Sequence, residues 1–283
     1  IIMKIQVGLN KGIDKARELI YSYFPEKKVK IEEVDYNARY FFNITPSKSK
    51  SLKDFYNRIS ELILDLILNI YSDDIIKKHI NSSYKNLKQD EKKELSEISK
   101  KLLLNKENFL IEKQYINNQI KSFVLDKLFI SVDGFIAFRL KDLSLLIRLV
   151  IDKGIEEFTA RKEYKEFISI LKYFVEIQEP KYRVINLVFE GHDYELYDDM
   201  GNKIYKDFFQ DIIVEIEKEG ISNDDLLVSS LIVLAPESLV VHLDESHRDR
   251  DVIRIITDVF DDRIYYCMGC EKCKIGLVAR HNE

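Results

Sequence analysis

The spacing of hydrophobic residues divides the chain into two kinds of segment. Over residues 4–45, and again from 183 onward, short apolar or alternating runs predict β-strands separated by turns or helical patterns. Between 52 and 178, apolar residues recur every three or four positions, which predicts long amphipathic helices. The pattern therefore predicts an α+β protein with a small N-terminal α/β unit (1–48), a helical middle region (49–180) and a C-terminal mixed sheet with helices (181–283).

Turn residues and capping residues set the limits of the predicted elements. The polar run that begins at Pro46 predicts a linker, and Pro180 predicts the end of the last long helix. Two long helices are expected just before that proline, with apolar stripes over 135–158 and 164–178. In the C-terminal region we expect strands at 183–189, 239–243 and 263–267, a hairpin over 194–204, and helices over 208–218, 222–236 and 248–260.

Composition and charge exclude several classes of protein. A hydrophobic fraction of 46% with 33% charged residues is typical of a folded globular chain, and the net charge of −5 provides no overall attraction to nucleic acid or anionic membranes. No run approaches the roughly 18 apolar residues of a membrane span. The first residues predict a strand rather than a secretory leader. We therefore expect a cytoplasmic protein with no membrane association.

The segment 77–106 is rich in lysine but does not have the pattern of a nucleic-acid-binding surface. Acidic residues interrupt it at Asp90, Glu91, Glu94 and Glu97. A solvated helical face explains such mixed charge better than a phosphate-binding surface does. We therefore do not expect a nucleic-acid partner. The long apolar stripes predict core packing first, with contact to an unknown protein partner or to a second copy as the alternative.

Two stretches of the middle region resemble a known family. They are Asp133-Gly-Phe-Ile-Ala-Phe-Arg-Leu-Lys141 and the segment 163–180, which ends in Glu-Ile-Gln-Glu-Pro. Both resemble the YtxC family, proteins assigned to sporulation in endospore-forming Firmicutes. The resemblance runs from residue 55 to residue 260 and implies a cytoplasmic protein linked to sporulation. The family has no defined catalytic or binding residues, so no residue role follows. We expect the protein to act through binding or interaction rather than catalysis.

The cysteines are the clearest candidates for site chemistry. The chain has three, Cys267, Cys270 and Cys273, and their C-x2-C-x2-C spacing lets the thiolates converge on one metal ion. A tetrahedral zinc site would need a fourth ligand. His281 is the working choice, and His242, His247 or a second subunit are the alternatives. Zinc is therefore the cofactor we expect if the cluster binds one.

An iron–sulfur cluster and a redox pair fit the cysteine spacing less well than zinc does. An iron–sulfur site is disfavoured because Leu277 occupies the position of the fourth cysteine. A redox pair is disfavoured because no helix pattern follows the motif, as it does in thioredoxin-like proteins. Three reduced thiols without a bound metal are the interpretation that the sequence narrowly favours over a metal site.

A second group of candidates lies at the end of a predicted strand. Strand alternation places His242 and Asp244 on one face, as a divalent metal or a general base would need, and His247 follows close by. His247 has a simpler explanation as a residue near a helix start. These three residues support a metal-dependent enzyme of the phosphoester hydrolase type as an alternative function. A nucleic-acid-associated factor with a structural zinc is the third hypothesis. No phosphate-binding glycine loop or other cofactor motif is present in the sequence.

Overall fold

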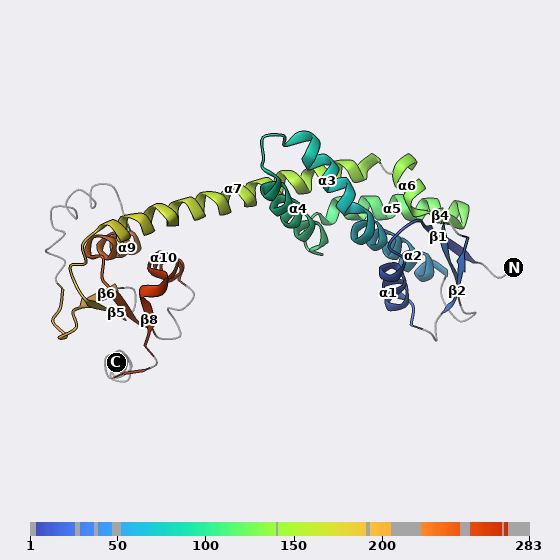
Figure 1. Ribbon diagram of the computed structural model, residues 1–283. Coiled ribbons are helices and arrows are strands. Elements are labelled where there is room, and N and C mark those ends of the chain that lie inside the picture. The colour runs from blue at the N-terminus through green and yellow to red at the C-terminus, as the bar shows by residue number, and fades with distance from the viewer. Residues whose placement is uncertain are drawn as a thin grey trace. The chain divides into compact units, whose positions relative to one another are not determined.

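The chain forms two compact units. The computed structural model describes residues 4–25, 29–36, 39–46, 52–139, 141–190, 193–204, 222–243, 250–267 and 269–270. The first unit is Ile1–Arg161 and the second is Lys162–Glu283. Each unit contains a four-stranded sheet together with helices (Figure 1). The predicted α+β class is therefore confirmed.

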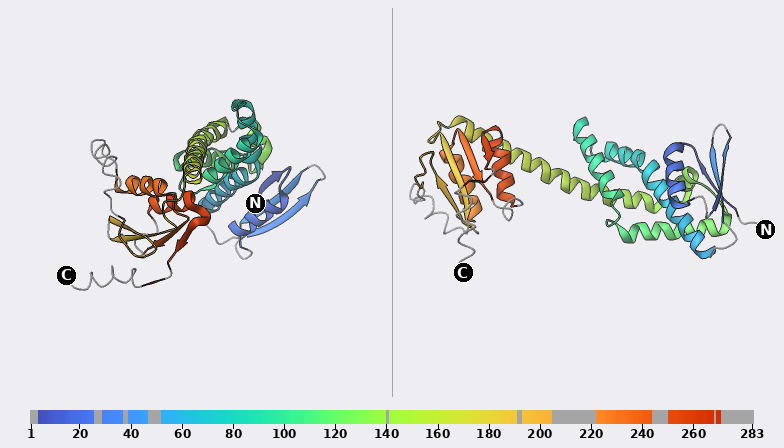
Figure 2. Two further views of the ribbon diagram at one scale, coloured as in Figure 1. Left: turned by 60° about the vertical axis from the view of Figure 1, so that its left-hand side comes forward. Right: turned by 90° about the horizontal axis from the view of Figure 1, so that it is seen from below.

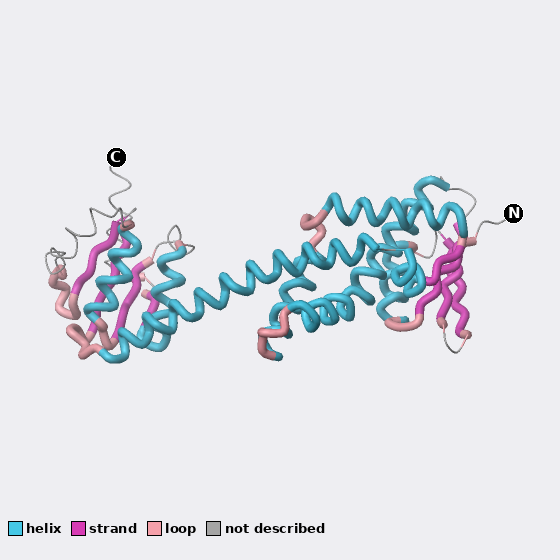
Figure 3. Tube along the Cα trace, turned by 90° about the horizontal axis from the view of Figure 1, so that it is seen from above, coloured by secondary structure: helices cyan, strands magenta, loops and turns pink. Residues whose placement is uncertain are grey.

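The sheet of the first unit has the strand order β2-β3-β1-β4. Its strands are β1 (Ile5–Leu9), β2 (Val29–Asp35), β3 (Tyr40–Pro46) and β4 (Phe129–Ser131), and α1 (Ile13–Tyr23) follows β1. Strand β3 is antiparallel to β1 and β2, whereas β4 is parallel to β1. The four strands lie side by side in Figure 3. Strand β4 was missed in the sequence because three residues are too few to show an alternating pattern.

The helices of the first unit pack with this sheet into one hydrophobic core. They are α2 (Leu52–Leu66), the π-helix η1 (Ile67–Tyr71), α3 (Ser72–Ser83), α4 (Gln89–Leu104), α5 (Leu110–Lys127) and α6 (Val132–Arg139), followed by the start of α7. Ile44 of β3, Ile59 of α2, Ile120 of α5 and Ile151 of α7 belong to the same buried cluster. Residues 5–46 therefore share their core with the helices that follow.

Helix α7 spans Lys141–Ile177 without a break and contains the boundary between the units. The sequence pattern predicted two helices here, and this was wrong. No proline or glycine lies between the two apolar stripes, and an Arg161–Glu157 ion pair one helical turn apart supports the intervening segment. Neither α7 nor any other described helix is apolar enough over a sufficient length to cross a membrane.

The sheet of the second unit has the order β6-β5-β7-β8. Its elements are β5 (Val184–Glu190), β6 (Asp193–Tyr197), α9 (Asn223–Leu234), β7 (Ser238–His242), α10 (Asp251–Phe260), the short 3-10 helix η4 (Asp261–Arg263) and β8 (Ile264–Tyr266). Strands β5, β7 and β8 are parallel, and β6 is antiparallel to β5. Helices α9 and α10 lie on one side of the sheet (Figure 2). Leu187 and Val241 are buried in the core on that side.

Local signals in the second unit predicted its caps and turns correctly. Ser222 caps α9, because its hydroxyl accepts a hydrogen bond from the Asp225 amide, with an N···O distance of 3.2 Å. The hairpin over 194–204 contains β6 and a bridge between Tyr197 and Lys203. The predicted linker at 47–51 and the predicted helix at 208–218 lie outside the described residues.

Candidate metal centre

Two neighbouring strands bring one histidine beside the cysteines. His242 is the last residue of β7, and Cys267 follows directly after β8. The parallel pairing matches Val241 with Tyr266, so the next pair in register is His242 with Cys267. The amide of Cys267 donates to the Val241 carbonyl over 2.9 Å, which extends the ladder by one hydrogen bond. Side chains in register on adjacent strands share a face of the sheet, so the imidazole and the first thiol become neighbours.

Three donor atoms converge at this point. The ligand atoms of His242, Cys267 and Cys270 all lie within 4.8 Å of one another, and His242 Nδ1 is 3.4 Å from Cys270 Sγ. Tetrahedral zinc, with Zn–S bonds of about 2.3 Å and Zn–N bonds of about 2.0 Å, holds nitrogen and sulfur ligands about 3.5 Å apart. The observed N···S separation therefore matches the spacing of two ligands in a zinc site.

Asn186 orients the imidazole. Its Oδ1 lies 3.1 Å from His242 Nε2, and its Nδ2 donates to the Asp198 carbonyl over 3.1 Å. The bond to Asp198 fixes which end of the amide is oxygen, so Nε2 must carry the proton and donate to Asn186. In the neutral imidazole Nδ1 is then the unprotonated nitrogen, and it faces Cys270. This is the tautomer that a metal ligand requires, and its orientation by a second hydrogen bond is typical of metal-binding histidines.

The turn after β6 holds Asn186 in place. The Asp198 carboxylate accepts from the Asn202 amide nitrogen over 2.7 Å and from the Asn202 side chain over 2.9 Å. The Asn202 side chain and the backbone amides of the turn keep the pKa of Asp198 below its usual value. The Asp198 carbonyl also accepts from the Gly201 amide over 3.2 Å. The turn lies within the hairpin predicted over 194–204, and it supplies the fixed acceptor for Asn186.

The site lies on the face of the sheet opposite the core with α9 and α10. Alternation along β7 places Val241 in that core and His242 on the other face. His242 is nevertheless only 6% exposed, while Cys267 and Cys270 are half-buried. Strands β5, β7 and β8 all end at this edge, where ligand sites of parallel sheets commonly form. Two thiols and a neutral imidazole suit zinc or another thiophilic metal.

The structure brings together only some of the residues predicted as metal ligands or as catalytic residues. Cys267 and Cys270 lie beside His242, which was one of the alternatives for the fourth ligand. Cys273 and His281 from the metal prediction, and Asp244 and His247 from the catalytic prediction, lie outside the described residues. The catalytic grouping of His242 with Asp244 and His247 therefore stays a prediction.

Asn186 was not predicted from the sequence. It lies in β5, far from the cysteines along the chain, and no motif marks it. Only the pairing of β5 with β7 places its amide next to His242. A polar residue among the apolar residues 184–189 was the single available signal.

The fold and the site together define an α+β protein with a candidate cysteine–histidine metal centre in its C-terminal unit. The chain belongs to the YtxC-like family, whose sequence profile matches residues 57–265. The family resemblance is thereby confirmed. The match contains His242 and Asn186 but ends before Cys267, so the argument for the metal centre rests on the geometry of this chain.

One curated relative shows the extent of the similarity. The chain is 24% identical over 162 residues to a protein of Bacillus subtilis (strain 168) described as "Uncharacterized protein YtxC". The aligned part covers 55% of this chain and 54% of that protein, so the chain spans about half the length of the relative. No solved structure matches the chain.

Proposed function

We propose that the C-terminal unit binds one zinc ion through His242, Cys267, Cys270 and Cys273, and that the protein acts by binding rather than by catalysis. The observation that carries the proposal is the convergence of the His242, Cys267 and Cys270 donor atoms within 4.8 Å. Cys273 completes the set because it repeats the spacing between Cys267 and Cys270. In the proposed set His242 takes the place of His281.

A structural role fits this set better than a catalytic one. Four protein ligands close the coordination sphere of zinc, whereas catalytic zinc keeps one position for water or substrate. The nearly complete burial of His242 also leaves little room for a substrate at the imidazole. Zinc bound here would fasten the segment after β8 to the end of β7, and its binding energy would add to the folding energy of the unit.

Metal analysis tests the proposal directly. Protein purified without a histidine tag should contain close to one zinc per chain by plasma mass spectrometry. His242→Ala and Cys273→Ser should each lower the zinc content to less than half. His79→Ala, in the first unit, should leave it unchanged. Wild-type protein without near-stoichiometric zinc would overturn the proposal. Loss of zinc in His281→Ala but not in His242→Ala would return His281 to the ligand set.

The proposal also includes the cellular role of the protein and the kind of partner it contacts. The family resemblance supports a cytoplasmic protein linked to sporulation, and the exposed apolar side chains of α7, such as Ile170 at 55% and Ile177 at 57%, support a protein partner or self-association. Deletion of the gene from a spore-forming host should reduce the number of heat-resistant spores. Complementation with the wild-type gene should restore them, and complementation with His242→Ala should not. An unchanged spore count after deletion would refute the sporulation role.

A further inference from the structure

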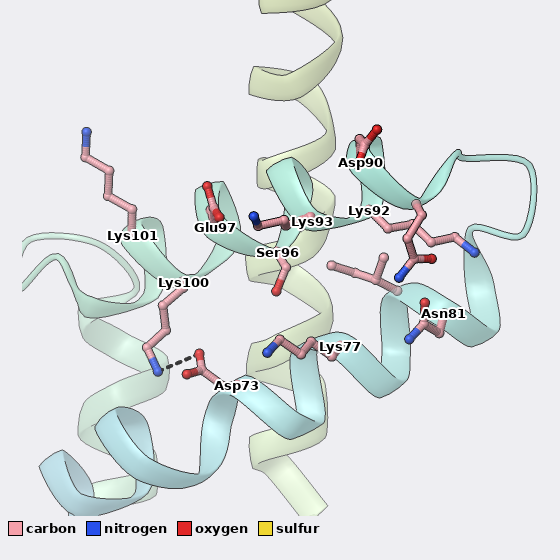
Figure 4. A pocket seen from close by; sticks show the side chains of 12 residues that line it. Asp73, Lys77, Asn81, Asp90, Lys92, Lys93, Ser96, Glu97, Lys100 and Lys101 are labelled. Carbon is pink, nitrogen blue, oxygen red and sulfur yellow. Dashed lines mark ion pairs between the residues drawn. The ribbon is translucent and has the colours of Figure 1, made fainter. Parts of the chain in front are cut away.

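A polar pocket lies between α3 and α4 in the first unit. Its volume is about 670 Å³, which is within the range of small-molecule sites. Both helices contribute lysines to it, and lysines outnumber carboxylates along its lining. Ile80, which is 1% exposed, provides an apolar part of its wall. In Figure 4, Lys77 and Ser96 face the space between the two helices, whereas Lys101 and Asp90 point away from it.

One side of the pocket is fixed by the π-helix. Lys100 forms an ion pair of 2.8 Å with Asp73. The same amine donates to the Leu68 carbonyl over 3.2 Å and to Ser72 Oγ over 3.1 Å. These contacts join Lys100 of α4 to Leu68 within η1 and to Ser72 and Asp73 at the start of α3. Lys100 therefore shapes the pocket and neutralises Asp73, and other lysines supply its excess positive charge.

Three other donors of the lining are accessible from the pocket. Lys77 of α3 and Lys93 and Ser96 of α4 form no hydrogen bond or ion pair with any described residue. Ser96 is only 8% exposed, and Figure 4 shows its hydroxyl pointing toward the same space as the amine of Lys77. The residue is largely buried but borders the pocket, so a ligand or water in the pocket can hydrogen-bond its hydroxyl. These two exposed amines and the hydroxyl are therefore accessible to a ligand that enters the pocket.

We propose that this pocket binds a small molecule carrying a phosphate or diphosphate group. Lysine ammonium groups bind phosphate as point charges, and Ser96 would donate a hydrogen bond to a phosphate oxygen. Ile80 would contact the uncharged part of the ligand. Asp90 and Glu97 also line the pocket. They would repel an extended nucleic-acid backbone that lay across its rim, whereas a short phosphate ester avoids them.

Titration with defined probes tests the site. Pyrophosphate and ADP, added separately to the full chain at low and at physiological ionic strength, should shift the amide resonances of α3 and α4, with weaker binding at the higher salt concentration. The double variant Lys77→Met/Lys93→Met should weaken binding at least tenfold, and Ser96→Ala should weaken it several-fold. Lys78→Met is the matched control, because Lys78 is an exposed lysine of α3 that does not line the pocket.

Three results would overturn the proposal. The first is that neither probe binds at millimolar concentration. The second is that Lys78→Met weakens binding as much as the double variant does, which would indicate nonspecific attraction. The third is that a single-stranded oligonucleotide binds more tightly than ADP and depends on the same lysines, which would make the surface a nucleic-acid site. None of these results depends on zinc, so the proposal stands or falls independently of the metal centre.

Discussion

Replacing Asn186 by alanine tests how the protein prepares His242 for metal binding. The substitution removes the acceptor that lies 3.1 Å from Nε2 and the donor that fixes the amide against the Asp198 carbonyl. His242 is 6% exposed, so its N–H group would remain buried without this partner. Loss of a partner for a buried polar group costs about 1–3 kcal/mol. The imidazole would also lose the contact that selects its tautomer and orientation.

The effect on zinc affinity can be estimated from the same contact. Removing the hydrogen-bond partner of a metal-bound histidine weakens binding by about 10- to 100-fold. We expect a decrease within this range for Asn186→Ala, measured by competition with a chromophoric zinc chelator at neutral pH. Asn186→Asp keeps an oxygen acceptor for Nε2, so it should recover most of the lost affinity.

Asn223 provides a matched control for the Asn186 substitution. Asn223 lies in the same unit, and its amide donates to Asp193 on the surface over 3.3 Å. Asn223→Ala should therefore leave zinc affinity unchanged. If Asn186→Ala destabilises the metal-free protein but binds zinc as tightly as the wild type, Asn186 supports the fold only. Its proposed role in orienting the ligand would then be wrong.

Three further predictions concern the first unit. Lys100→Met should lower the free energy of unfolding in urea by about 1–3 kcal/mol, because the Leu68 carbonyl, Ser72 Oγ and Asp73 each lose a partner; an unchanged value would show that these contacts do not stabilise the unit. Burial alone would raise the pKa of Asp133, but hydrogen bonds led by that from Arg39 keep it below its usual value. This pair therefore stabilises the fold above about pH 4, and its contribution is lost as the pH falls through the lowered pKa. Asp133→Asn should accordingly lose less stability than the wild type on acidification, and equal losses would argue against the pairing. Gly12 has φ 66° at the start of α1, so Gly12→Ala should destabilise the unit by about 1–2 kcal/mol in thermal unfolding, whereas an unchanged melting temperature would contradict the strained conformation.

Much of the second unit was predictable because its signals are local. The Ser222 cap, the strand 239–243 and the turn at 198–202 each depend on residues within a few positions of one another. Continuous helix α7 was predicted as two helices because its stripes face different surroundings along its length, and periodicity does not show whether the segment between them is helical. The π-helix η1 was not predicted, because no local pattern marks it, and the contact of Lys100 with its Leu68 carbonyl forms only in the folded chain.

The sequence alone determined the class of the fold and the cluster of cysteines, because hydrophobic spacing and motif spacing are properties of neighbouring residues. It left His242, His247 and His281 as alternatives for the histidine ligand. Only the tertiary structure placed His242 beside Cys267 and Cys270, through the parallel pairing of β7 and β8. The two strands pair because one whole face of the sheet is buried against α9 and α10. The local pattern of a strand does not show which other strand it pairs with. The same long-range packing placed Asn186 next to His242, and Lys77 opposite Ser96 across the pocket.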